Sequence, residues 1–238
     1  MNDLKSINLQ FNALTVYRAV LRDETIACFA RVLNVAQSGS ASDFCEHYGA
    51  FLQQLSNQTG SFDLARHIER LIRYDDNAFT HAAALGGRSE GYLALRKAAK
   101  FDLDAFRAVA EVSALELKKS VLTRGSETES ELVSRLPDYS SEHELFSGDT
   151  EAMLSSLEAF HRANGYGVFA RFGAFRWDHQ LLGIPRPDPI RLSDLKSYEY
   201  ERGLVAANTK DFVDGRGGGN MLLYGDRGTG KSSTIKAL

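Results

Sequence analysis

The stretch Gly225-Asp226-Arg227-Gly228-Thr229-Gly230-Lys231-Ser232 satisfies the pattern G-x-x-x-x-G-K-[ST]. Between a strand and a helix, this pattern marks a glycine-rich loop that cradles the phosphates of a nucleoside triphosphate. The apolar run 220–224 before the loop predicts a short buried strand, and residues 232–238 after it predict the start of a helix. The stretch therefore predicts the first strand and phosphate loop of an α/β nucleotide-binding domain.

The residue types of this loop indicate how it would hold phosphate. Gly225, Gly228 and Gly230 let the backbone curl so that its amide N–H groups point inward, and the following helix adds the positive end of its dipole. We expect Lys231 to be the catalytic residue that reaches the β- and γ-phosphates, and the Ser232 hydroxyl to be the ligand of Mg²⁺. The other positions predicted to contact the cofactor are Asp226, Arg227, Thr229 and Ser233.

A phosphate loop alone does not make an ATPase. Hydrolysis also needs an acidic residue that helps to hold Mg²⁺ and to position water, and usually an arginine finger. Neither can be assigned in this sequence. Asp211 and Asp214 are not candidates for the acidic residue, because they precede the expected strand and that residue would follow it. The pattern ends at Ser232, close to Leu238, so we expect the chain to be the front part of a larger enzyme and not to hydrolyse ATP by itself.

The composition fits a globular protein and narrows its partners. The chain has 238 residues, of which 43% are hydrophobic, and a formal net charge of −3, so nucleic acid is not an expected partner. No run approaches the roughly 20 apolar residues of a membrane span. The polar start of the chain does not resemble a signal peptide, which predicts a cytoplasmic protein without membrane contact. Cys28 and Cys45 lack metal-ligand spacing and are expected to be reduced thiols on two helices.

Residues 1–124 are expected to form a helical domain. Apolar residues recur there at three- and four-residue spacing, which is typical of helices packed as a bundle. The spacing predicts helices over 4–21, 26–36, 44–55, 64–72 and 89–122, with Gly39 and Gly60 ending the second and third.

Residues 125–150 have a different composition. Acidic residues and serines predominate, and Pro137 lies in the middle of the segment. This composition predicts an exposed linker with a short helix over 131–136. An acidic docking segment is the alternative.

A helix and a β element are expected over 151–183. Asp149 or Thr150 has the residue type of an N-cap for a helix through Phe160. The aromatic-rich stretch Gly165–Trp177 gives the strongest strand signal outside the phosphate loop. We expect this strand to pack in a core or between domains, with stacking on nucleic acid as the alternative.

Residues 184–238 are expected to begin the nucleotide-binding domain. Three prolines, at 185, 187 and 189, favour an extended crossing, and a helix is predicted over 197–213 before the glycine-rich linker 215–219. This arrangement resembles the AAA+ ATPases, in which a short P-x-x-L-x-D-L segment and a helix precede the first strand and close over adenine. The matching positions are Leu192, Ser193, Asp194, Leu195 and Tyr198. The resemblance implies adenine contacts for Leu195 and Tyr198, although relatives often have glycine where this chain has Lys196-Ser197.

The last fifty or so residues are also similar to an uncharacterised bacterial family, catalogued as domain of unknown function 815, whose members are predicted AAA+ ATPases. The similar stretches are Pro187-Asp188-Pro189-Ile190-Arg191-Leu192, Asp194-Leu195, Tyr198-Glu199, Asn208-Thr209, Phe212 and 222–233. The resemblance implies an ATP-driven machine with Mg²⁺ as a further cofactor and an unknown protein client. AAA+ relatives commonly work as rings, which implies a homo-oligomer for the full protein.

The expected fold is thus a mainly α N-terminal domain with a small β element, followed by the start of an AAA+-like domain. Two other functions remain open. The chain could be a helical interaction module whose glycine loop is a remnant that binds no nucleotide. It could also belong to a small-molecule kinase or a GTPase, since the same cradle serves both and does not by itself distinguish ATP from GTP.

Overall fold

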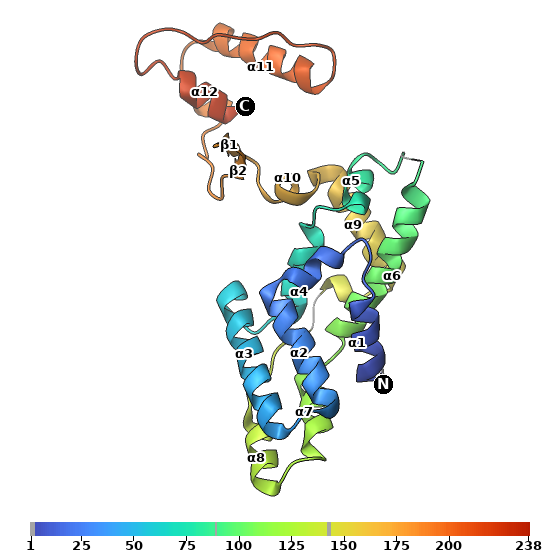
Figure 1. Ribbon diagram of the computed structural model, residues 1–238. Coiled ribbons are helices and arrows are strands. Elements are labelled where there is room, and N and C mark those ends of the chain that lie inside the picture. The colour runs from blue at the N-terminus through green and yellow to red at the C-terminus, as the bar shows by residue number, and fades with distance from the viewer. Residues whose placement is uncertain (1–2, 89, 142–143) are drawn as a thin grey trace. The chain divides into compact units, whose positions relative to one another are not determined.

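Helices build most of the chain, as Figure 1 shows. The computed structural model describes residues 3–88, 90–141 and 144–238. Internal contacts divide the chain into an N-terminal unit, Met1–Gly173, and a C-terminal unit, Ala174–Leu238. Among the described residues, none of the helices combines the length and the apolar character that crossing a membrane would require.

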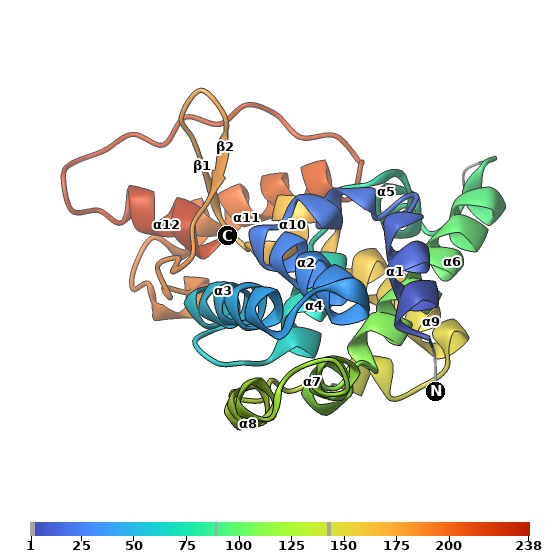
Figure 2. The same ribbon diagram turned by 60° about the horizontal axis from the view of Figure 1, so that its bottom comes forward.

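The regular elements described in the N-terminal unit are all helices, as apolar spacing predicts for residues 1–124. Its elements are α1 (Leu4–Asn12), η1 (Arg18–Arg22), α2 (Glu24–Ser38), α3 (Ala41–Thr59), α4 (Leu64–Arg73), α5 (Ala78–Ala84), α6 (Tyr92–Ala110), α7 (Ala114–Leu122), α8 (Glu127–Arg135), η2 (Glu144–Phe146), α9 (Thr150–Asn164) and α10 (Gly167–Arg171). Helices α2 and α3 lie side by side in both views (Figures 1 and 2). Gly39 ends α2 and Gly60 ends α3, both as predicted, and Asp149 caps α9 through a hydrogen bond from the Ala152 amide.

The helix predicted over 4–21 is wrong in its second half, because a distant carboxylate interrupts it. Helix α1 ends at Asn12, and the next residues bind the buried Asp102 of α6. The Asp102 carboxylate accepts hydrogen bonds from the amides of Thr15 and Tyr17, at 2.9 Å each, and from the Thr15 hydroxyl at 3.0 Å. These bonds satisfy a buried charge and hold backbone N–H groups that a continuous helix would use itself.

The helix predicted over 89–122 is also two helices, although Ser89 lies outside the described residues. Helix α6 ends at Ala110, and α7 begins after Ser113. Ser113 and Glu116 form a capping box, in which each side chain binds the backbone amide of the other. This local N-terminal signal overrides the continuous apolar spacing.

Most described residues of the acidic segment 125–150 are exposed, as expected, but four apolar side chains join it to the core. Val133, Tyr139, Leu145 and Phe146 are buried in the N-terminal core, and the Tyr139 hydroxyl donates to the Val112 carbonyl at 2.7 Å. The short helix expected there is present as α8, which begins earlier than predicted. Composition hid this packing because a few apolar residues are spaced among many acids, and Glu142 lies outside the described residues.

The single strand predicted over 165–177 is wrong. The stretch contains the short helix α10, and only Phe175–Trp177 is a strand, β1, which pairs antiparallel with β2 (Leu181–Gly183). Gly165 and Gly167 both have positive φ angles, of 82° and 53°, which an extended strand does not use. Trp177 is 75% exposed, so β1 does not place it in a core.

The C-terminal unit holds the β1–β2 hairpin, η3 (Leu192–Asp194), α11 (Glu199–Val213) and α12 (Lys231–Ala237). The buried strand predicted over 220–224 is wrong, since these residues have no regular structure and Leu222 is 85% exposed. A strand needs hydrogen bonds from a neighbouring strand, and β1–β2 is the only sheet in the part of the chain described.

Candidate functional site

The glycine loop before α12 has the backbone conformation that its sequence predicts. Gly225, Gly228 and Gly230 have φ angles of 139°, 88° and 83°, values that other residues adopt only at a cost. Cβ atoms built on Gly228 and Gly230 would meet no atom within 4 Å. Glycine is thus favoured there by its backbone conformation and not by crowding.

Lys231, the first residue of α12, folds its side chain back over the loop. Its Nζ donates hydrogen bonds to the carbonyl oxygens of Gly225 and Asp226, at 2.9 and 2.6 Å, and to the Thr229 hydroxyl at 3.2 Å. The ammonium group is therefore held among acceptors inside the curve of the loop. Phosphate oxygens are stronger acceptors for an ammonium group than neutral carbonyls are, so an anion entering the loop could take over these bonds.

Two threonines join the loop to α12. The Thr229 hydroxyl donates to the Asp226 carbonyl at 2.9 Å. The buried Thr234 binds the Gly230 carbonyl twice, through its amide at 2.8 Å and its hydroxyl at 3.0 Å. Thr234 was not among the predicted site residues, although its place four residues after Gly230 is the spacing at which threonine bonds back to a helical carbonyl.

The predicted metal ligand is accessible. Ser232 is exposed, and its hydroxyl makes no hydrogen bond within the described residues, nor do the side chains of Arg227 and Ser233. No group of three or more His, Cys, Asp and Glu residues suited to a metal ion occurs in 3–88, 90–141 or 144–238. The predicted ligand Ser232 supplies one hydroxyl oxygen, which fits Mg²⁺ only where phosphate and water complete the oxygen shell.

Polar links fix the segments around the loop. Lys236 of α12 pairs with Asp188 at 3.0 Å, and its hydrogen bond holds the pKa of that carboxyl below the usual value. The Asn208 side chain binds the Gly219 backbone both ways, donating to its carbonyl and accepting from its amide, each at 2.9 Å. Neither link was predicted, because the residues that each one joins are 11 and 48 positions apart in the sequence and have no local signal.

The residues expected near adenine are not joined to the loop by any hydrogen bond or ion pair of the described residues. Leu195 follows η3, and Tyr198 precedes α11 with a φ angle of 57°. Ser197 also has a positive φ, of 62°, and its carbonyl accepts a hydrogen bond from Arg202. The left-handed backbone thus occurs at a position where AAA+ ATPases often have glycine, while the adenine contacts of Leu195 and Tyr198 stay predictions.

Residues 170–238 match the model of a protein family described as 'Protein of unknown function (DUF815)'. The match spans the hairpin, α11, the glycine loop and α12, and it leaves the N-terminal helices outside except the end of α10. Comparisons with curated proteins and with solved structures found no match. The similarity of the C-terminal segment to this family is therefore confirmed, and the family's description assigns no activity.

Proposed function

We propose that residues 184–238 begin an AAA+-like nucleotide-binding domain and that the loop 225–232 binds the phosphates of ATP together with Mg²⁺. The observation that supports this most directly is the position of Lys231. Its ammonium group lies 2.9 and 2.6 Å from loop carbonyls, inside a loop in which both glycines of the pattern, and Gly228 between them, have positive φ. A basic side chain over an open, glycine-lined backbone curve suits an anion with several oxygens.

Each loop residue has a role in the proposal. Lys231 exchanges its carbonyl contacts for β- and γ-phosphate oxygens, and Ser232 supplies an oxygen ligand to Mg²⁺. Gly225, Gly228 and Gly230 let backbone amides approach the phosphates, with Asp226, Arg227, Thr229 and Ser233 completing the loop. Leu195 and Tyr198 are assigned to the adenine side on the resemblance alone. Bound ATP supplies the phosphoanhydride bond whose hydrolysis drives AAA+ proteins.

We propose binding without turnover for the chain as described. Asp211 and Asp214, the acids nearest the loop in sequence on its N-terminal side, are both engaged by Arg216, at 2.8 and 2.7 Å. A carboxylate held in this way is poorly placed to position attacking water. ATP hydrolysis, ring assembly and a protein client therefore belong to the proposal for the whole protein.

Titration with a fluorescent ATP analogue in Mg²⁺ tests the proposal. We expect saturable binding that Lys231→Ala weakens at least about tenfold, the loss of one strong charge-assisted contact. Ser232→Ala should weaken binding in Mg²⁺ but not in EDTA, because its hydroxyl acts through the metal. Lys210→Ala is the matched control, since this lysine lies on α11 and pairs with Asp214 at 2.7 Å.

The same titration separates the alternatives. An affinity that Lys231→Ala leaves unchanged would overturn the proposal and favour a helical interaction module with a remnant loop. Competition by unlabelled GTP at lower concentrations than ATP would instead favour a GTPase. Transfer of phosphate to an added small molecule, lost in Lys231→Ala, would favour a kinase.

A further inference from the structure

A polar cavity of about 350 Å³ lies within the N-terminal unit, away from the glycine loop in sequence. It opens where the start of α2, the end of α3, the end of α4 and the end of α10 meet. The polar side chains that line it are Asp23, Gln58, Arg70, Tyr74, Asp75 and Arg171. Two acids and two arginines give the lining no formal net charge, so its preference depends on which of these groups are already engaged.

The Asp23 carboxylate is engaged by the protein. It caps α2 by accepting from the Ile26 amide at 3.1 Å, and it binds Nε2 of the fully buried His67 at 2.8 Å. Nδ1 of the same imidazole lies 3.3 Å from a guanidinium nitrogen of Arg70. These contacts, from Asp23 through His67 to Arg70, hold Arg70 at the cavity wall and occupy one edge of its guanidinium group.

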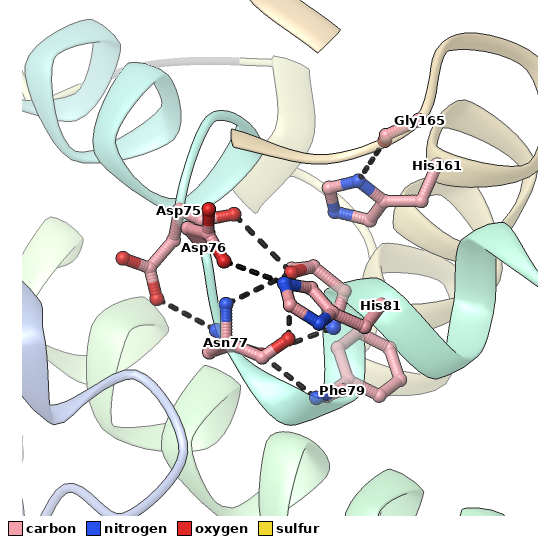
Figure 3. Close-up of polar contacts among 8 residues, drawn as sticks. Asp75, Asp76, Asn77, Phe79, His81, His161 and Gly165 are labelled. Carbon is pink, nitrogen blue, oxygen red and sulfur yellow. Dashed lines mark hydrogen bonds and ion pairs between the residues drawn. The ribbon is translucent and has the colours of Figure 1, made fainter. Parts of the chain in front are cut away.

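The Asp75 carboxylate is also occupied. It accepts a hydrogen bond of 2.6 Å from the Asn77 side chain, whose oxygen caps α5 by binding the amides of Phe79 and Thr80 (Figure 3). Burial raises the pKa of Asp75 above its ordinary value, which favours the neutral acid. Asp75 therefore contributes less negative charge to the cavity than its residue type suggests.

The hydrogen-bond donors of the cavity are largely free. Within the described residues, neither Arg70 nor Arg171 pairs with a carboxylate, and the side chains of Gln58 and Tyr74 make no hydrogen bond. The Arg171 guanidinium lies over the Phe172 ring, 5.2 Å from its centroid, which leaves the edges that carry its N–H groups available. The cavity thus offers unused donors from α3, α4 and α10, while Asp23 binds the protein through Oδ1 and Asp75 through Oδ2, so that one oxygen of each carboxylate makes no side-chain hydrogen bond in the described part of the chain.

We propose that this cavity binds a small organic anion whose carboxylate or phosphate oxygens are held by Arg70 and Arg171. Guanidinium groups match both oxyanions because they donate two parallel hydrogen bonds to each. A volume of about 350 Å³ is in the range of small-molecule sites and exceeds the needs of an inorganic ion. Binding joins the end of α10 to α4, two residues before the chain enters the C-terminal unit.

Calorimetric titration of the full chain carrying Lys231→Ala tests this inference, because that substitution weakens phosphate binding at the glycine loop. The probes are inorganic phosphate and succinate, each at constant ionic strength set with sodium chloride. We expect at least one probe to bind saturably, and Arg171→Gln to weaken it about tenfold, the effect of losing one charge-assisted contact. The probe with the higher affinity identifies the oxyanion class.

Matched variants keep the result specific. Arg66→Gln removes an exposed arginine from the same helix as Arg70 and should leave the affinity unchanged. Arg70→Gln should weaken binding like Arg171→Gln, with circular dichroism confirming that the His67 contact is not needed for folding. Bound probe should also slow hydrogen exchange at 168–172. The inference is overturned if neither probe binds saturably, if Arg171→Gln leaves the affinity unchanged, or if Arg66→Gln lowers the affinity as much as Arg171→Gln does. These outcomes do not depend on the result at the glycine loop.

Discussion

The two units of this chain are stabilised by different forces. The N-terminal unit buries a continuous apolar core that includes Phe11, Phe29, Phe51 and Phe106, each fully inaccessible to solvent. In the described part of the C-terminal unit, only Val205 and Thr234 are buried, while large side chains such as Leu222 are exposed. The C-terminal unit thus has the family match and the motif but few buried side chains. The N-terminal unit lies almost wholly outside the family match and has most of the buried side chains.

Polar links take the place of a core in the C-terminal unit. Asp188–Lys236 and Arg216–Asp211 are ion pairs between side chains that are each more than two-fifths exposed. Exposed pairs contribute about 0–1 kcal/mol each, whereas burial of one large apolar side chain contributes about 1.5–3 kcal/mol. We therefore expect the C-terminal unit to open locally at a much lower free energy than the N-terminal unit unfolds.

The largest expected effect contrasts one side chain from each unit. Phe106 packs edge-on against the rings of Phe11 and Tyr17, with centroids 6.0 Å away in both cases. Phe106→Ala should lower the free energy of unfolding by about 3–5 kcal/mol, because it removes burial and leaves a cavity. Leu222→Ala, the control in the other unit, should change it by less than about 0.5 kcal/mol. Urea unfolding followed by far-UV circular dichroism measures both.

Equal losses in these two variants would break the comparison. They would mean that Leu222 is covered in solution and that the C-terminal unit has a core of its own. Peptide-resolved hydrogen exchange then locates the change, since protection around 220–224 should be low if the comparison holds.

Sequence alone predicted the elements whose signals are local. The helices α2 and α3 follow from apolar spacing, and Gly39 and Gly60 end them as predicted. It failed where distant residues decide the structure. The break after Asn12 depends on Asp102, and the predicted strand 220–224 has no neighbouring strand to pair with among the described residues. The anion cavity has no motif, because its arginines come from two helices a hundred residues apart.

A medium effect sharpens the comparison through pH. His161 is fully inaccessible in the N-terminal unit. Its Nδ1 binds the Gly165 carbonyl at 2.9 Å (Figure 3), and its Nε2 finds no hydrogen-bond partner among the residues that the structure describes. Burial, aided by nearby Arg73, lowers the pKa of His161. As pH falls below about 6.5, the unfolded chain therefore binds a proton at this histidine before the folded chain does. The free energy of unfolding of the N-terminal unit should then fall by at most about 1.4 kcal/mol per pH unit.

Unfolding curves between pH 7 and pH 5 check this effect. This range lies above the pH at which most carboxyl groups titrate, so the slope reports mainly histidine. His161→Gln should flatten the slope, whereas His179→Asn, at an exposed position in the other unit, should leave it intact. A slope that His161→Gln does not alter would assign the pH dependence to another group.

The smallest expected effect lies in the C-terminal unit, where backbone strain is large relative to the weak packing. Ser197 has a φ angle of 62°, a conformation that costs a non-glycine residue about 1–2 kcal/mol. Ser197→Gly relieves this cost, and the hydrogen bond from Arg202 remains because its acceptor is the backbone carbonyl. After the added entropy of an unfolded glycine, the net gain should be about 0.5–1 kcal/mol, read as slower hydrogen exchange in the first turn of α11. Lys196→Gly, at a neighbouring position without positive φ, should speed the same exchange, and a gain there equal to that of Ser197→Gly would show that strain at Ser197 does not limit the stability of this unit.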